Sequence, residues 1–147
     1  IHGNEHVTTY FVHGNIVIVK FNFKGEVEWM DLIPKKQTST DGGYYAGYGL
    51  MQLNNGNLVI VFNDNPKNSF YDKLDKIYSW IPNRNNTDLV LYEITDEGYV
   101  NHVIIYKCAD EQVLSIPAIS VGIEGNEMVI VGQTKKRTKL VKLVFRD

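Results

Sequence analysis

Short runs of β-branched and aromatic residues, separated by turn residues, recur along the whole chain. Such runs are typical of β-strands. They predict strands at 15–22, 26–33, 46–53, 57–63, 88–95, 99–107, 117–123, 127–133 and 139–145. The intervening turns place Gly or Asn where a tight hairpin needs positive φ, as in Phe23-Lys24-Gly25, Asn54-Asn55-Gly56, Asp96-Glu97-Gly98 and Glu124-Gly125-Asn126. Consecutive strands joined this tightly are antiparallel, because a parallel crossover needs a dozen or more residues.

Two of the runs are apolar at successive positions, which indicates that both faces of their sheets are covered. An antiparallel sheet with one wet face would alternate apolar and polar residues. Residues 58–62 and 128–131 do not alternate. Hairpin connections combined with burial on both faces favour small antiparallel sheets stacked face to face, as in the four-stranded blades of a β-propeller. A two-sheet β-sandwich is the alternative.

An internal repeat supports the interpretation as propeller blades. Residues 15–27 align with residues 88–100 at an offset of 73 residues, and a second hairpin follows each copy. In the usual blade order the strands form the outer half of one blade, one whole blade and three strands of another. The segment 64–87 has no strand character and is interpreted as a long loop insertion. Its spacing allows a short helix at 70–79, although a surface excursion is favoured.

Composition places the chain among ordinary globular proteins. The 147 residues are 44% hydrophobic and carry a formal net charge of −2, which predicts one all-β domain over 1–147 and argues against nucleic-acid binding. No apolar run reaches the ~20 residues of a membrane-spanning helix. Because the chain begins at Ile1 and both ends fall within a blade, we interpret it as the C-terminal part of a longer propeller. Its predicted partner is the remainder of that parent chain, or a second copy through self-association.

Three segments resemble the recurring signature of a bacterial protein family. They are Ile33-Pro34-Lys35-Lys36-Gln37, Asp41-Gly42-Gly43-Tyr44 and Phe62-Asn63-Asp64-Asn65-Pro66-Lys67-Asn68. Together they are similar to an uncharacterised family of secreted or envelope-associated bacterial propeller-like proteins, and the resemblance covers most of 15–107. It implies a propeller fold and an extracytoplasmic location in the periplasm, at the cell surface or outside the cell. It implies no activity.

No complete catalytic motif or cofactor motif is present in the sequence. The string His2-Gly3-Asn4-Glu5-His6 matches H-x-x-E-H of one class of zinc peptidases, but Gly and Asn are poor helix formers and the motif needs a helix. Phosphate-binding glycine motifs are lacking, and Asn63-Asp64-Asn65 does not have the spacing of a calcium loop. We therefore predict no cofactor and no metal site.

Eight polar and aromatic residues in two loops are the candidate ligand-binding residues. They are Lys36, Gln37, Asp41, Tyr44, Asn63, Asp64, Lys67 and Asn68. The repeat places both loops at strand ends of adjoining sheets, so Lys36, Gln37 and Asp41 are expected to approach Asn63 and Asp64. Amide and carboxylate groups beside aromatic rings suit a glycan or peptide ligand. In the alternative interpretation the same side chains only tie the long loops to neighbouring sheets.

Two classes of function remain open from the sequence. A non-catalytic scaffold or binding module for a protein, peptide or glycan is favoured, since no triad, metal cluster or phosphate loop is complete. The alternative is a part of an envelope glycan-processing enzyme whose catalytic residues lie outside this chain.

Overall fold

The computed structural model describes residues 7–40, 42–70, 76–123 and 126–146, and most of these residues form β-strands. The strands are β1 (Phe11–His13), β2 (Ile16–Phe21), β3 (Val27–Ile33), β4 (Gln37–Ser39), β5 (Gly49–Gln52), β6 (Leu58–Asp64), β7 (Asp88–Ile94), β8 (Val100–Lys107), β9 (Leu114–Ile123), β10 (Glu127–Gln133) and β11 (Thr138–Val144). The helical segments are short: η1 (Pro66–Phe70), η2 (Arg84–Asn86) and α1 (Cys108–Glu111). The all-β prediction is confirmed, and the nine predicted strands correspond to β2, β3 and β5–β11.

The strands form antiparallel sheets that largely follow the order of the chain. Strands β5-β6-β7-β8 form a four-stranded sheet, β9-β10-β11 a three-stranded sheet and β2-β3 a hairpin, while β1 pairs with β4. Every strand pair in the described parts of the chain is antiparallel. This topology is shared by the propeller and sandwich interpretations, which both stay predictions.

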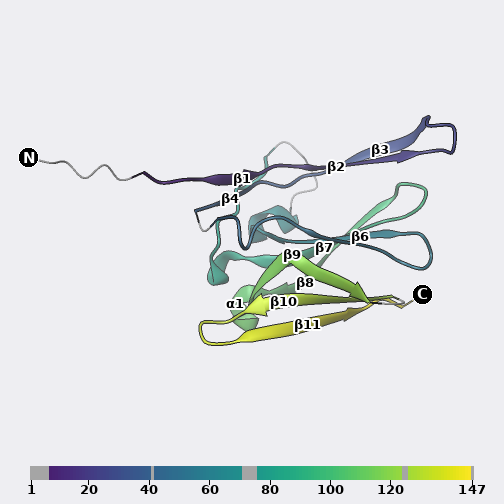
Figure 1. Cartoon of the computed structure of the whole chain (residues 1–147). Helices are drawn as coiled ribbons and strands as arrows, with labels where there is room; N and C mark the ends of the chain where they lie inside the picture. Colours follow the sequence, from purple (N-terminus) through teal and green to yellow (C-terminus); the bar gives the residue numbers. More distant parts are fainter. Residues whose placement is uncertain (1–6, 41, 71–75, 124–125, 147) are drawn as a thin grey trace, which may run out of the picture.

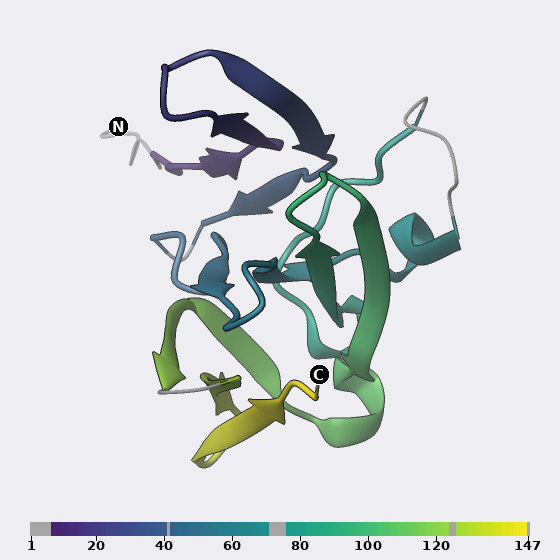
Figure 2. The ribbon, with the colours of Figure 1, turned by 90° about the vertical axis from the view of Figure 1, so that its right-hand side faces the viewer.

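The three larger sheets are stacked face to face, with the four-stranded sheet in the middle (Figures 1 and 2). On one face of the middle sheet, Ile60, Phe62 and Val90 pack against Ile16 and Ile33 of the β2–β3 hairpin. The opposite face contributes a second cluster, which joins Val59, Val61, Leu89 and Leu91 to Met128 and Ile130 of β10. The prediction that the 58–62 strand is covered on both faces is therefore confirmed.

The corresponding prediction for 128–131 is only half right. Met128 and Ile130 are buried against the middle sheet, but Val129 and Val131 on the other face of β10 are half-buried. The reason is that β9–β11 is the last layer of the stack, so no further sheet covers its outer face among the residues described (Figure 1).

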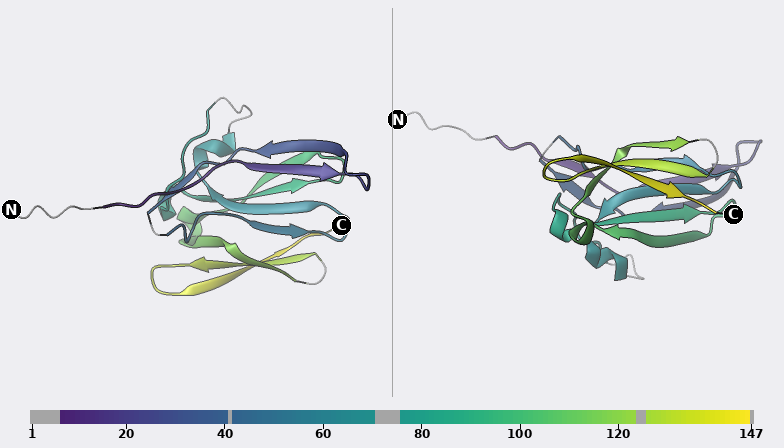
Figure 3. Two further views of the ribbon diagram at one scale, coloured as in Figure 1. Left: turned by 45° about the horizontal axis from the view of Figure 1, so that its top comes forward. Right: turned by 90° about the horizontal axis from the view of Figure 1, so that it is seen from below.

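Glycines close the hairpins at one end of the stack, where the turns of the successive sheets lie (Figure 3). Gly25, Gly56 and Gly98 have φ of +82°, +90° and +90°, a conformation that L side chains rarely adopt. The predicted hairpins at 23–25, 54–56 and 96–98 are thereby confirmed. Of the fourth predicted turn, Glu124 and Gly125 lie outside the described residues.

The described residues of the 64–87 segment lie at the opposite end of the stack and contain little regular structure. It begins with η1 and ends with η2, whose first turn is capped by the Asn83 side chain accepting from the Asn85 amide. Residues 71–75 lie outside the described part, and the described residues 76–79 are not helical, so the surface excursion fits better than a 70–79 helix. None of the described helical segments has the length and the apolar character that a membrane-spanning helix requires.

Candidate functional site

Strand β4 is the centre of the candidate site at the end of the stack opposite the hairpin turns. It pairs with β1 on one side, and on the other it meets the segment around Trp80, where Gln37 and Trp80 form a parallel bridge. The Thr38 amide donates to the Trp80 carbonyl at 2.9 Å, and the Trp80 amide donates to the Lys36 carbonyl at 2.8 Å. The long loop is therefore anchored to β4 through its backbone.

Gln37 is fully buried and connects three segments of the chain. Its Nε2 donates to the Asn63 carbonyl at 2.7 Å. Its Oε1 accepts from the Gly47 amide and from the Lys35 Nζ, both at 2.9 Å. Every one of these partners lies within the protein, so Gln37 acts as an internal crosslink between β4, β6 and the 42–48 loop.

Asn63 continues this network toward β9. Its Nδ2 donates to the Ser115 carbonyl at 2.8 Å and to the Tyr45 carbonyl at 3.0 Å. Its Oδ1 is buried and has no hydrogen-bond partner in the structure. The side chain thus ties the end of β6 to its neighbours, because buried amides are stabilised by such bonds to backbone groups.

Asp64 and Asn68 hold the start of the long loop. The Asp64 Oδ1 accepts from the Asn65 amide at 2.8 Å and from the Asn68 Nδ2 at 2.7 Å. Asn68 also bonds to both backbone groups of Tyr78. Burial raises the pKa of the Asp64 carboxyl to about 6, and the hydrogen bonds from Asn68 and Asn65 offset only part of this effect.

Lys35 is the unexpected member of the network, because it is only 3% exposed. Burial lowers the pKa of its ammonium group to about 8, although the negative charge of Asp64 acts in the opposite direction. The adjacent Lys36 is exposed. Of the two lysines, the one that reaches the polar interior is therefore Lys35, which is not among the eight predicted residues.

The structure brings together part of the predicted set. Gln37 and Asn63 meet as expected, and Asp64 and Asn68 belong to the same network. The other described members have exposed side chains: Lys36, Tyr44 and Lys67. Tyr44 packs edge-on against Tyr45, and the Lys67 ammonium lies 5.2 Å from the Tyr78 ring centre.

Two predicted features lie outside the described residues. They are Asp41 and the His2-Gly3-Asn4-Glu5-His6 string. Within the described ranges, no group of three or more His, Cys, Asp or Glu side chains is placed to hold a metal ion.

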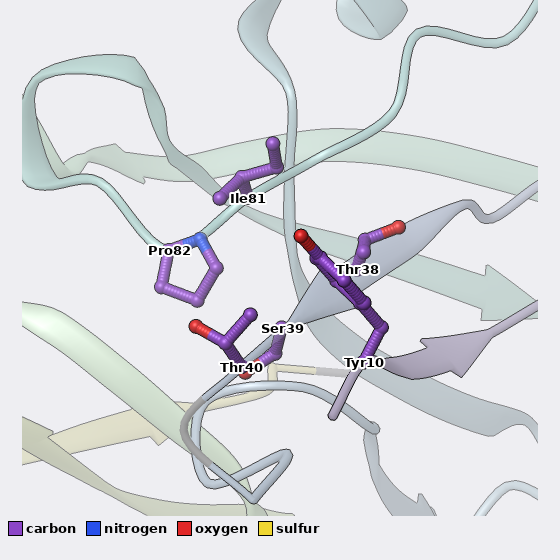
Figure 4. A pocket seen from close by; sticks show the side chains of 6 residues that line it. All are labelled: Tyr10, Thr38, Ser39, Thr40, Ile81 and Pro82. Carbon is purple, nitrogen blue, oxygen red and sulfur yellow. The ribbon is translucent and has the colours of Figure 1, made fainter. Parts of the chain in front are cut away.

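A cleft of about 290 Å³ lies beside the polar network, between β4 and the chain after Trp80. Its lining residues are Tyr10, Thr38, Ser39, Thr40, Ile81 and Pro82. Ile81 and Pro82 form one side, and Tyr10 and the β4 residues form the other (Figure 4). Among the described residues, the lining offers the hydroxyls of Tyr10, Thr38 and Thr40, three apolar or aromatic surfaces and no charged side chain, while Ser39 is only 1% exposed. It suits a neutral ligand that has many hydroxyls.

The Ile81-Pro82 wall of this cleft follows directly after Trp80, which anchors it. The indole is fully buried, and its Nε1 donates to the Thr87 Oγ1 at 2.8 Å. The Thr87 hydroxyl donates in turn to the Asn83 carbonyl at 2.6 Å. These bonds fix both ends of the Ile81-Pro82 wall.

Sequence reasoning missed every residue of the cleft lining. The run Thr38-Ser39-Thr40 is a visible local signal, since three successive hydroxyl side chains follow directly after the predicted Lys36 and Gln37. Ile81 and Pro82 carry no such signal. They lie beside β4 because Trp80 forms a bridge with Gln37, and this contact between distant parts of the sequence is visible only in the folded chain.

Comparison with known protein families, with curated proteins and with solved structures finds no match to this chain.

Proposed function

We propose that this chain is a non-catalytic binding module built from β-propeller sheets, and that the β4 cleft binds a neutral glycan. The propeller part of the proposal is supported by the four-stranded sheet in chain order, by its burial on both faces and by the 73-residue repeat. The extracytoplasmic location implied by the resemblance stays a prediction. Such a location would give the module access to envelope glycans.

The single observation that carries the glycan part is the composition of the cleft. Thr38, Thr40 and Tyr10 contribute hydroxyls, which both donate and accept hydrogen bonds as sugar hydroxyls do. The Tyr10 ring, which belongs to a residue that is 64% exposed, provides a face on which a sugar ring can stack. The volume is at the small end of ligand pockets, typically ~300–1,000 Å³, and fits one ring-sized group.

The buried network has a supporting role in this function. Gln37 and Thr38 are consecutive residues of β4, so fixing Gln37 in the interior fixes the outward direction of Thr38. A binding group held in this way loses little conformational entropy when a ligand arrives.

Binding to an array of neutral oligosaccharides tests the proposal. We expect at least one class of oligosaccharide to bind, and Tyr10→Ala to weaken that binding by up to about tenfold through loss of the stacking face. Tyr99→Ala is the matched control, because Tyr99 is 73% exposed and lies between β7 and β8, next to the Gly98 hairpin turn. Absence of binding across the array, or equal losses in the two variants, would refute glycan recognition at this cleft.

A further inference from the structure

Each of the two outermost layers of the stack, the β2–β3 hairpin and the β9–β11 sheet, presents an outer face that is apolar and exposed. On the β2–β3 hairpin, Val17 is opposite Leu32 and Val19 is opposite Met30, so these four side chains share the outer face. Val17 is 57% exposed and Met30 is 68% exposed. Their neighbours at the turn, Phe21 and Val27, are each 58% exposed, so the apolar surface continues along the whole hairpin.

The outer face of β9–β11 has the same character. Its exposed apolar side chains are Val121, Ile123, Leu140 and Val144, and the half-buried Val129 and Val131 lie between them. Leu140 is 71% exposed. Lys142 and Glu127 form an ion pair on this face, with 2.7 Å between the Lys142 Nζ and the Glu127 Oε1. Soluble proteins rarely expose contiguous apolar faces of this kind unless another surface covers them.

The repeat indicates what kind of surface covers these faces. The 73-residue offset places Val17 at the position of Val90, and Val19 at the position of Tyr92. Val90 is fully buried and Tyr92 half-buried, because the β2–β3 hairpin packs on that face of the middle sheet. The same repeat position is therefore covered by a sheet in the second repeat, at Val90, and exposed in the first repeat, at Val17.

The two exposed faces also lie on opposite sides of the stack and point away from each other. Inside the molecule, the side of the β2–β3 hairpin that bears Ile16 packs on the middle sheet, and the middle sheet packs on the side of β9–β11 that bears Met128. The stack thus runs in one direction, and its two free faces are those that would meet if the stacking continued. A second copy of this chain presents both.

We infer that copies of this chain associate head to tail, the outer face of β9–β11 in one copy packing on the outer face of the β2–β3 hairpin in the next. The contact would continue the stacking that already joins the sheets within one copy. A heterologous contact of this kind forms rings where the rotation closes and open chains where it does not. The inference rests on the sheet stack and is independent of glycan binding at the β4 cleft.

Sedimentation of the full 147-residue chain and two variants tests this inference. Met30→Glu places a charge on the β2–β3 face, and Leu140→Glu places one on the β9–β11 face. The unmodified chain is expected to exceed the monomer mass as its concentration rises. Each variant alone is expected to be monomeric over the same range, with a dissociation constant raised about tenfold or more. Val103→Glu, on an exposed strand residue of the middle sheet, is the control and should associate like the unmodified chain.

Mixing the two variants distinguishes head-to-tail contact from other forms of association. Met30→Glu retains an intact β9–β11 face and Leu140→Glu an intact β2–β3 face, so an equimolar mixture should form a one-to-one dimer and nothing larger. Circular dichroism and thermal unfolding verify that each variant is folded before it is used. A monomeric unmodified chain at all concentrations overturns the inference. So does disruption by only one of the two variants, which would indicate a symmetric contact, or a mixture that stays monomeric.

Discussion

Replacement of Asp64 by Asn should stabilise the protein at neutral pH and alter how its stability depends on pH. Asp64 is 2% exposed, and it lies opposite Asp88 in the β6–β7 pair, whose negative charge adds to the effect of burial. An asparagine side chain has nearly the same shape. Its Oδ1 can accept the two hydrogen bonds that Asn65 and Asn68 donate. The substitution therefore removes a buried negative charge and leaves the loop anchored.

The magnitude follows from the pKa of the Asp64 carboxyl, which burial raises from 3.8 to about 6. The unfolded chain releases this proton near pH 3.8, whereas the folded chain retains it until about pH 6. Folding is therefore favoured most at low pH, and this contribution is lost as the pH rises through that interval. At 1.36 kcal/mol per pH unit, the full loss is about 3 kcal/mol, reached as the pH rises from well below 3.8 to well above 6.

Urea unfolding between pH 4 and pH 7.5, followed by fluorescence of the buried Trp80, measures this effect. The free energy of unfolding of Asp64→Asn minus that of the unmodified chain should grow by about 2 kcal/mol from pH 4 to pH 7.5, because part of the effect has already developed at pH 4. The measurement uses the lowest protein concentration that fluorescence allows, so that association between copies does not contribute. Glu97→Gln, at an exposed carboxylate in a hairpin turn, is the matched control. Parallel pH profiles for Asp64→Asn and the unmodified chain would refute a buried, protonatable Asp64.

Two further substitutions and one labelling reaction test the packing. Phe62→Ala should cost about 3–5 kcal/mol of unfolding free energy, because Phe62 is fully buried and stacked on Tyr92, whereas Phe23→Ala, at a 95% exposed ring, should cost little. Gly49→Ala should destabilise the β5–β9 contact, since a Cβ there would lie 2.9 Å from the Pro117 carbonyl oxygen, and Gly14→Ala, with open space around it, should be neutral in thermal unfolding. Cys108 should not react with a thiol reagent at pH 8 unless urea is present, because burial raises the pKa of its thiol to about 12; rapid labelling of the folded chain would contradict that placement.

The strands and turns were predictable because their signals are local. A run such as 58–62 has strand propensity at every position, and Gly56 marks the positive φ that its hairpin needs. The sequence could not predict which face of β10 lacks cover, because Val129 and Met128 are both apolar residues with similar sequence signals. Their different burial depends on where the stack ends.

The candidate site was only partly predictable because its chemistry depends on which side chains point inward. Between 33 and 39 the buried positions alternate, and Ile33, Lys35, Gln37 and Ser39 all lie inside. This period of two predicts a buried Lys35 once Ile33 is known to be buried. Lysine is almost never fully buried without a partner, so the pattern was outweighed by the general preference of its side chain for solvent.

Backbone amide shifts, recorded while the chain is titrated with the neutral oligosaccharide that the array selects, test glycan binding at the β4 cleft most directly. Recognition at the cleft predicts that the largest shift changes occur at Tyr10, Thr38, Thr40 and Ile81, and that they saturate together with one dissociation constant. Shift changes that instead concentrate at the hairpin turns around Gly56 and Gly98, at the opposite end of the stack, would contradict it.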